Sequence, residues 1–394
     1  MKFTSELLHQ IEANLETGAL APPIYQTSTF VQEAPGVNKG FDYSRSNNPT
    51  RKCLEDLLAS LEKGAGACAF SSGLAAVDAV LKTLKSGDKI IAVDDVYGGS
   101  FRAFTHVYKK FGIEVEYVDT SSIQTVEQAL SDEVKLVWLE SPTNPTLKIS
   151  DISRIAQLCK CVGAKLVVDN TFASPVLQRP LELGADYVIQ SATKYISGHS
   201  DVIAGAVIAK SDEDAAEIKF IQNATGAVLG PWDSYLLIRG LHTLELRVKQ
   251  SCNTALALAE YLEQQDFVKQ VNYPGLKSHP NHEIAKAQQG GYFGAVISFS
   301  FHEDTAESAK LFLAGLQRFK LAESLGGTKS LVCHPASMTH KSTPRSTRLN
   351  AGVNDSLVRL SIGIEDTECL IDDCKRGFAY FESRIVKDLV DGVC

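Results

Sequence analysis

The stretch Tyr187-Val188-Ile189-Gln190-Ser191-Ala192-Thr193-Lys194 leads from an apolar run directly into two hydroxyl side chains and a lysine. A second apolar run, Leu166-Val167-Val168, ends on Asp169, 25 positions before Lys194. Short apolar runs bounded by polar residues predict buried strands. We therefore expect a lysine and a carboxylate at the carboxyl ends of two strands, which is where open α/β sheets bind their ligands.

These side chains suit one cofactor. A lysine amine forms a Schiff base with an aldehyde, and the hydroxyls of Ser191 and Thr193 can bind phosphate. The Asp169 carboxylate can keep a pyridine nitrogen protonated, so that the ring accepts electrons. The pattern predicts an enzyme that uses pyridoxal 5'-phosphate (PLP).

Apolar runs alternate with amphipathic stretches over most of the chain, which predicts an α/β fold with a mostly parallel sheet covered by helices on both faces. We expect strands at residues 67–70, 89–93, 115–118, 135–139, 165–168, 187–190 and 206–209. Helices are expected at 74–84, 153–161 and 180–183. After Gly240 we expect one long helix over 241–265, then strand, helix and strand at 296–301, 306–316 and 358–362.

This change of pattern predicts three parts: an extended arm over residues 1–50 that contacts a neighbouring subunit, a large cofactor-binding domain over 51–240 and a small C-terminal α/β domain over 241–394. A chain of 394 residues also exceeds the usual size of a single core.

The composition excludes several classes of partner. A net charge of -8 argues against a binder of nucleic acid or of acidic membranes, because a polyanion would be repelled over most of the surface. No apolar stretch is long enough to span a bilayer, so we expect a cytoplasmic protein without membrane contact. The nine cysteines are expected to be free. Cys159-Lys160-Cys161 and His279-Pro280-Asn281-His282 lack the spacing of a metal site, and no metal is expected.

A phosphate site is also predicted where Ser71-Ser72-Gly73-Leu74 follows a strand and opens a helix. Taken alone, Ser72 would be read as an ordinary helix N-cap. The nearby Gly64-Ala65-Gly66-Ala67-Cys68-Ala69 has the spacing of a dinucleotide loop, but a helix precedes it and a strand follows, which is the reverse of what that loop needs. A nicotinamide dehydrogenase is therefore the weaker enzyme hypothesis.

Several segments of the chain match the motifs of one enzyme family. They are Tyr43-Ser44-Arg45-Ser46-Asn47-Asn48-Pro49-Thr50, Ser72-Gly73, Tyr97-Gly98-Gly99, Glu140-Ser141-Pro142-Thr143-Asn144-Pro145, Val168-Asp169-Asn170-Thr171-Phe172 and Ser191-Ala192-Thr193-Lys194-Tyr195. On these motifs the chain, from about residue 20 to 385, resembles the Cys/Met metabolism family of PLP-dependent enzymes. The resemblance implies the fold-type-I, aminotransferase-like architecture and a homotetramer built from two active dimers.

The resemblance also implies roles for individual residues. Lys194 would link the cofactor, Asp169 would pair with its pyridine nitrogen, and Tyr97 would stack on its ring and share in catalysis. The phosphate would be held by Gly73, Leu74, Ser191 and Thr193, with Tyr43 and Arg45 supplied across the dimer interface. An amino-acid substrate would be bound by Arg102, Asn144, Glu323, Ser324 and Arg359.

Within the family the chain resembles the cystathionine γ-lyase and γ-synthase groups. Glu323 matches their glutamate, where β-lyases commonly carry tyrosine, and it could receive the distal ammonium of cystathionine. Arg102 matches an arginine that binds a distal carboxylate, and Gly99 stands where methionine γ-lyases have cysteine. The resemblance implies γ-elimination of cystathionine, with γ-replacement on a homoserine ester as the alternative and another lyase of the family as a further one. A degenerate homologue that serves as a binding protein is a hypothesis of a different class.

Overall fold

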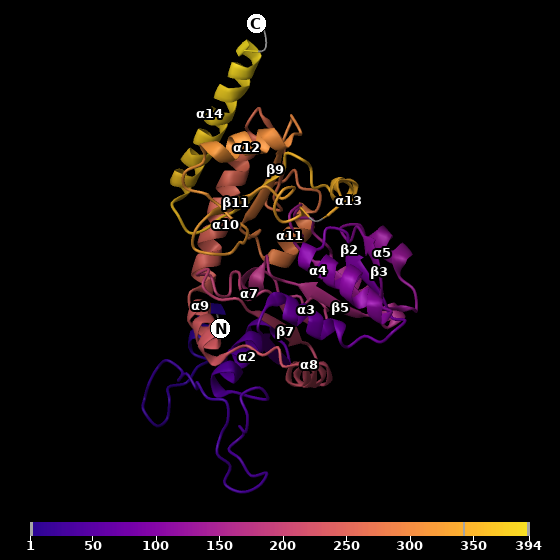
Figure 1. The fold of residues 1–394 in the computed structure, drawn as a ribbon, viewed down its shortest axis with the longest axis vertical. Helices are drawn as coiled ribbons and strands as arrows, with labels where there is room; N and C mark the ends of the chain where they lie inside the picture. The colour runs from indigo at the N-terminus through magenta and orange to yellow at the C-terminus, as the bar shows by residue number, and fades with distance from the viewer. Residues whose placement is uncertain (1–2, 342, 392–394) are drawn as a thin grey trace. The chain divides into compact units, whose positions relative to one another are not determined.

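The computed structural model describes residues 3–341 and 343–391 (Figure 1). Contacts between residues divide the chain into two units. Unit 1 comprises Met1–Val93, Gly99–Glu140 and Asp151–Glu245, and unit 2 comprises Asp94–Gly98, Ser141–Ser150 and Leu246–Cys394. Two short segments of the first half of the chain thus belong with the C-terminal half, an arrangement that no single boundary along the sequence can express.

Unit 1 is built on a seven-stranded sheet whose order is β1-β7-β6-β5-β4-β2-β3. The strands are β1 Gly66–Phe70, β2 Lys89–Val93, β3 Glu114–Val118, β4 Val134–Glu140, β5 Lys165–Asp169, β6 Tyr187–Gln190 and β7 Gly205–Ala209. Strands β3, β2, β4, β5 and β6 run parallel, whereas β7 is antiparallel to both β6 and β1. The predicted α/β class with a mostly parallel sheet is confirmed.

Polar caps define where the helices of unit 1 begin. Asn48 accepts the backbone N–H groups of Thr50 and Arg51 at the start of α2 (Pro49–Glu62), and Ser72 accepts that of Ala75 at the start of α3 (Gly73–Leu81). Such caps satisfy amide groups that have no partner within the helix. The other helical segments of this unit are α1 Phe3–Leu8, α4 Gly98–Arg102, η1 Ala103–Val107, η2 Tyr108–Phe111, α5 Ile123–Ala129, α6 Ile152–Val162, α7 Ser174–Leu177, α8 Asp212–Thr225 and α9 Pro231–Leu241.

Unit 2 contains a five-stranded sheet of order β10-β11-β12-β9-β8. Its strands are β8 Val268–Asn272, β9 Val296–Phe301, β10 Lys320–Leu321, β11 Leu331–Cys333 and β12 Val358–Ser361. Its helices are α10 Leu244–Glu263, α11 His282–Gln289, α12 Ala306–Gly315, α13 Arg345–Asn350 and α14 Thr367–Asp391. Phe299 and Phe301 of β9 form ring contacts with Phe312 of α12 and Phe378 of α14. The closest pair joins the two helices, with the centroids of Phe312 and Phe378 4.8 Å apart.

Three expectations for local structure were wrong. The region 241–265 holds the last residue of α9 and the whole of α10, with a turn at His242 and Thr243 in place of one continuous helix. Residues 180–183 form a turn, because only three residues lie between Pro180 and Gly184, whose φ is 113°. The predicted arm begins with helix α1.

None of the helices in the described ranges is both long and apolar enough to cross a bilayer.

Candidate functional site

The carboxyl ends of β5 and β6 carry a connected set of polar side chains. Asp169 ends β5, and its Oδ1 accepts hydrogen bonds from the Thr171 amide at 3.0 Å and the Thr171 hydroxyl at 2.5 Å. The same hydroxyl oxygen accepts the Ser191 amide at 2.8 Å. Because β5 and β6 are adjacent and parallel, Thr171 joins the predicted pyridine partner to the predicted phosphate ligand.

Asp169 is poised between its two charge states. Loss of water around the half-buried strand end raises the pKa of this carboxyl to about 6, and the two hydrogen bonds from Thr171 act in the opposite direction. A cation beside it would favour the ionised form. A protonated pyridine nitrogen supplies such a cation, so the site fits the aromatic part of PLP.

The start of α3 lies against β6 and β7 through two glycines. A Cβ atom on Gly73 would approach the Ser191 Oγ to 3.0 Å, and one on Gly205 would approach the Ser72 carbonyl oxygen to 2.2 Å. At Gly205 only glycine allows the backbone to come this close, and at Gly73 the contact with Ser191 would be tight. The first-turn amides of α3 and the Ser191 side chain therefore form a narrow cradle, whose amides and helix dipole favour an anion such as phosphate.

Lys194 and Thr193 lie in the turn that follows β6. The Lys194 amide donates to the Ser191 carbonyl at 3.0 Å. This hydrogen bond closes a turn, so Lys194 comes only three residues after Ser191 of the cradle. The Thr193 hydroxyl donates to the Ala204 carbonyl at 3.0 Å and accepts the Ala204 amide at 2.9 Å. The hydroxyl proton of Thr193 therefore binds the residue that precedes β7, a role that the sequence did not predict.

Unit 2 contains a buried cation on β12. Arg359 is 3% exposed and donates from Nη1 to the Asn144 Oδ1 at 2.8 Å and from Nη2 to the Ser324 carbonyl at 3.0 Å. Both acceptors are neutral, the buried Nε has no hydrogen-bond partner, and no carboxylate of the described residues forms an ion pair with this guanidinium. A buried charge without a counter-ion is costly, so the site suits an anionic ligand.

The surroundings of Arg359 add to the preference of this site for an anionic ligand. Burial, together with the charges of Arg359 and Arg348, lowers the pKa of His340 to about 4, so the imidazole is neutral at pH 7. Glu323 is exposed and precedes Ser324 in the chain. Unit 2 therefore brings together four of the five predicted substrate residues: Asn144, Glu323, Ser324 and Arg359.

The segment 141–150, which carries Asn144, is fixed on two sides. Asp95 is buried and accepts the Thr146 amide at 3.1 Å and the Thr146 hydroxyl, which ties segment 141–150 to the segment that carries Tyr97. On the other side, four side chains donate to four of the carbonyls of 145–150. They are Ser298 to Pro145, His279 to Leu147, Asn281 to Ile149 and Gln288 to Ser150.

The tautomer of His279 follows from its contacts. Its Nδ1 accepts the Asn281 amide at 3.2 Å, so Nε2 carries the proton that is donated to Leu147. Burial lowers the pKa of His279, in keeping with a neutral ring. Segment 141–150 is thus a rigid support for the Arg359 site.

Four predicted residues lie on exposed surfaces. Tyr43 and Arg45 belong to the arm, where the Arg45 guanidinium lies 5.6 Å from the centre of the Tyr43 ring and donates to the Asn223 carbonyl at 2.7 Å. Arg102 ends helix α4 in unit 1. Tyr97 is 44% exposed in unit 2.

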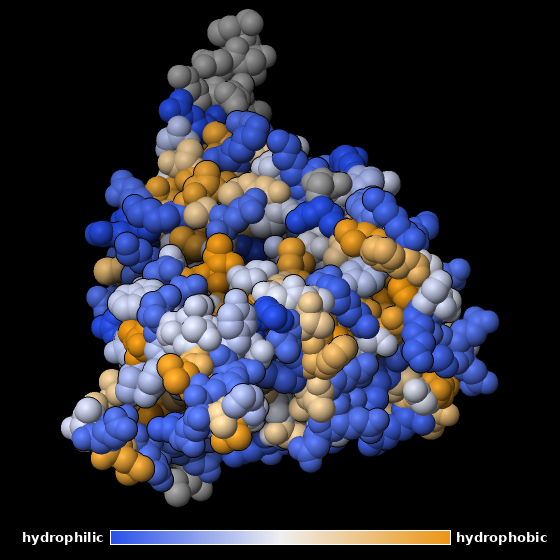
Figure 2. Space-filling view, turned by 60° about the horizontal axis from the view of Figure 1, so that its bottom comes forward, coloured by the Kyte–Doolittle hydropathy of each residue, from blue (hydrophilic) through white to orange (hydrophobic). Residues whose placement is uncertain are grey.

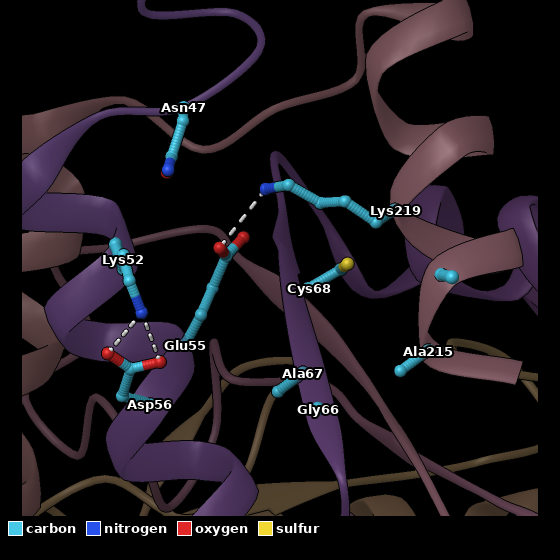
Figure 3. Close-up of a pocket in the computed structure, with 10 residues that line it drawn as sticks. Asn47, Lys52, Glu55, Asp56, Gly66, Ala67, Cys68, Ala215 and Lys219 are labelled. Carbon is cyan, nitrogen blue, oxygen red and sulfur yellow. Dashed lines mark hydrogen bonds and ion pairs between the residues drawn. The ribbon is translucent and has the colours of Figure 1, made fainter. Parts of the chain in front are cut away.

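A separate hollow of about 300 Å³ lies in unit 1 between α2, β1 and α8 (Figure 3). Its two lysines are paired with carboxylates: Lys52 with Asp56 at 2.7 Å and Lys219 with Glu55 at 3.3 Å. None of the predicted site residues lines this hollow.

Sequence reasoning missed Thr171, Gly205, Asp95 and His279, which position the predicted residues without belonging to the predicted set. Thr171 stood inside a matching motif and Gly205 precedes an apolar run, so both had a local signal. Asp95 and His279 had none, because their partners lie 51 and 132 positions away.

Comparison with known proteins gives a consistent result. The model of the family described as Cys/Met metabolism PLP-dependent enzyme matches residues 4–379. A cystathionine γ-lyase of Bacillus subtilis (strain 168) is 48% identical over 374 residues, covering 95% of this chain and 98% of the relative. A cystathionine β-lyase of Lactococcus lactis subsp. cremoris (strain MG1363) is 50% identical over 365 residues, with 93% and 95% covered. A cystathionine γ-synthase of Xanthomonas oryzae pv. oryzae, solved in complex with cystathionine, has a TM-score of 0.94 at 42% identity, with 97% and 99% covered.

Proposed function

Because the chain belongs to the Cys/Met metabolism family of PLP-dependent enzymes, we propose that it is a cystathionine γ-lyase. It would convert cystathionine and water to cysteine, 2-oxobutanoate and ammonia. The observation that carries the proposal is Arg359, a buried guanidinium that lacks a carboxylate partner and is held by Asn144 and Ser324. An arginine fork of this kind suits the α-carboxylate of an amino acid.

The cofactor site is proposed at the ends of β5 and β6. Lys194 would hold PLP covalently, Asp169 would face its ring nitrogen, and Ser191 with the start of α3 would hold its phosphate. When bound, PLP supplies an electron sink for the carbanion that forms at Cα.

The protein would supply proton transfers and charge recognition. The Lys194 Nζ would take the proton from Cα and move it, and it would then take a second proton from Cβ. The Cγ–S bond would then break, and its electron pair would leave with the sulfur of cysteine. Arg359 would hold the α-carboxylate throughout, and Glu323 would receive the distal ammonium group.

The same residues could also serve two other activities, those of a β-lyase and of a γ-synthase. The Lactococcus relative is named a β-lyase and the Xanthomonas structure a γ-synthase. Glu323 favours γ-chemistry, because it stands where the sequence resembles γ-lyases and γ-synthases.

The products identify the reaction. The purified enzyme is given cystathionine alone, and the keto acid is identified by chromatography. We expect 2-oxobutanoate together with cysteine. Pyruvate with homocysteine would establish a β-lyase and contradict the proposal. A parallel reaction with O-succinyl- or O-acetyl-homoserine plus cysteine tests for a γ-synthase, which would be indicated by a higher kcat/KM for making cystathionine than for breaking it.

We further propose a homotetramer of two active dimers, in which the arm reaches a second copy of the chain. Figure 1 draws the arm, in indigo, as open loops leading away from α2. Its Leu15, Leu20 and Val31 are 99%, 85% and 95% exposed. On the face drawn in Figure 2, apolar side chains reach the surface in several patches separated by polar ones. Apolar side chains gathered on an open segment are typical of an interface.

A further inference from the structure

A buried carboxyl lies next to the proposed cofactor site but outside the set of residues expected to bind the cofactor. Glu62 ends helix α2 and is 1% exposed. Its Oε1 accepts hydrogen bonds from the Asn170 Nδ2 at 3.1 Å and the Gln190 Nε2 at 2.7 Å. One oxygen atom therefore joins side chains from two different strand ends.

The two donors are the immediate neighbours of proposed cofactor ligands. Asn170 follows Asp169, and Gln190 precedes Ser191. Asn170 is held further by Gln178, whose Nε2 donates to the Asn170 Oδ1 at 3.1 Å and whose carbonyl accepts the Asn170 Nδ2 at 2.8 Å. A shift of the Glu62 carboxyl would therefore move the ends of both β5 and β6.

Burying the Glu62 carboxyl costs free energy, which argues that this side chain does more than fill space in the core. The Glu62 Oε2 is buried and has no hydrogen-bond partner among the described residues, and burial raises the pKa of this carboxyl to about 7. An apolar side chain of similar size would avoid that cost but would offer no acceptor to Asn170 and Gln190.

We propose that Glu62 is a positioning residue for the cofactor, which sets the spacing between Asp169 and Ser191 by holding Asn170 and Gln190. This inference rests on the cofactor site proposed above. Glu62 would act only through these two amides.

Two substitutions at Glu62 test the proposal. Glu62→Met keeps the length of the side chain and removes the acceptor, whereas Glu62→Gln keeps one acceptor oxygen. PLP affinity is measured by titrating the apoenzyme, and the visible absorbance and circular dichroism of the bound cofactor are recorded. We expect Glu62→Met to weaken PLP binding about tenfold, as for loss of a hydrogen bond to a charged group, and to reduce the visible dichroism. Glu62→Gln should stay within about threefold of wild type.

Glu55 provides a matched control on the same helix. It is also a buried carboxyl, but it accepts the Ala69 amide at 2.9 Å and the Gln222 Nε2 at 3.0 Å, and it forms part of the hollow in Figure 3. Glu55→Gln should lower the midpoint of thermal unfolding without altering the PLP titration or the cofactor spectrum. If Glu62→Met does not fold, Gln190→Leu removes the same contact from the strand side and should weaken PLP binding in the same way.

The outcomes separate this inference from the proposed site. Borohydride reduction followed by peptide mapping shows which lysine holds PLP. If Lys194 is trapped and Glu62→Met binds PLP with wild-type affinity and spectrum, Glu62 is merely structural and the inference is wrong. If another lysine is trapped, both the proposed cofactor site and the proposed role of Glu62 are wrong.

Discussion

At the scale of single residues, the most informative contrast is between Arg359 and Glu323. Arg359 is buried and fixed by two hydrogen bonds, whereas Glu323 is exposed. We propose that the first holds the carboxylate that every amino-acid substrate carries. The second lies on the surface next to Ser324, and we propose that it distinguishes substrates by their distal group.

Replacing Glu323 with alanine should therefore affect substrates unequally. An ion pair at an exposed site contributes about 1 kcal/mol, so we expect KM for cystathionine to rise roughly fivefold. KM for a γ-substrate without the distal amino group should stay within about twofold of wild type. Steady-state kinetics on both substrates provides the measurement, and equal increases would show that Glu323 does not read that group.

A second residue-scale prediction concerns pH. Burial raises the pKa of Glu62 from its ordinary value of 4.5 to about 7 in the fold. The hydrogen bonds from Asn170 and Gln190 and the charge of Arg179 act in the opposite direction, and the charge of Glu182 adds to the rise. Between these values the unfolded chain releases this proton and the folded chain keeps it, so stability falls as pH rises. The loss is on the order of 3 kcal/mol between pH 4.5 and 7.

Glu62→Gln cannot titrate and should escape that loss. Urea unfolding of the holoenzyme at pH 5 and pH 8 should show the variant gaining stability relative to wild type at the higher pH. Asp95 and Asp169, whose pKa values burial raises to about 6, titrate in both proteins and cancel in the difference. A difference that does not change with pH would mean that Glu62 has an ordinary pKa.

At the scale of elements, segment 141–150 is the least regular part of the candidate site and the one with the most supports. We predict that Thr146→Val, which removes the hydroxyl donated to Asp95, costs about 1–3 kcal/mol of stability because a buried carboxyl loses a partner. Since Asn144 lies two positions away, KM for cystathionine should rise more than kcat falls.

The surface of the same segment supplies the control for this substitution. Lys148 pairs with Asp94 at 2.9 Å, where both side chains are partly exposed. Lys148→Met should cost at most about 1 kcal/mol and leave KM near the wild-type value. Denaturant unfolding and kinetics on both variants provide the comparison. If the two variants behave alike, the buried contact has no special part in placing Asn144.

The elements also show which parts of the structure could be predicted from the sequence. Strands β4 to β6 are short, apolar and bounded by polar residues, so local pattern was sufficient for them. Glu62 had a readable signal as well, because it falls seven positions after Glu55 on a helix face that also presents Leu54, Leu58 and Leu61 to the core. The fixing of segment 141–150 had none beyond its family motif, since His279, Asn281 and Gln288, which support it, lie more than 130 positions away, and contacts at that separation leave no periodic pattern.

At the scale of the whole molecule, the proposed sharing of Tyr43 and Arg45 between subunits can be tested by mixing two inactive variants. Arg45→Ala would lack the phosphate contact of the arm, and Lys194→Ala would lack the covalent link. In a mixed dimer one site would combine an intact Lys194 with an intact Arg45 from the other subunit, and the second site would carry both defects. Random reassociation of equal amounts makes half of the dimers mixed, so activity should recover to about a quarter of the wild-type value. If Arg45 serves the site of its own subunit, every site retains one defect, and mixing should restore no activity above that of the separate variants.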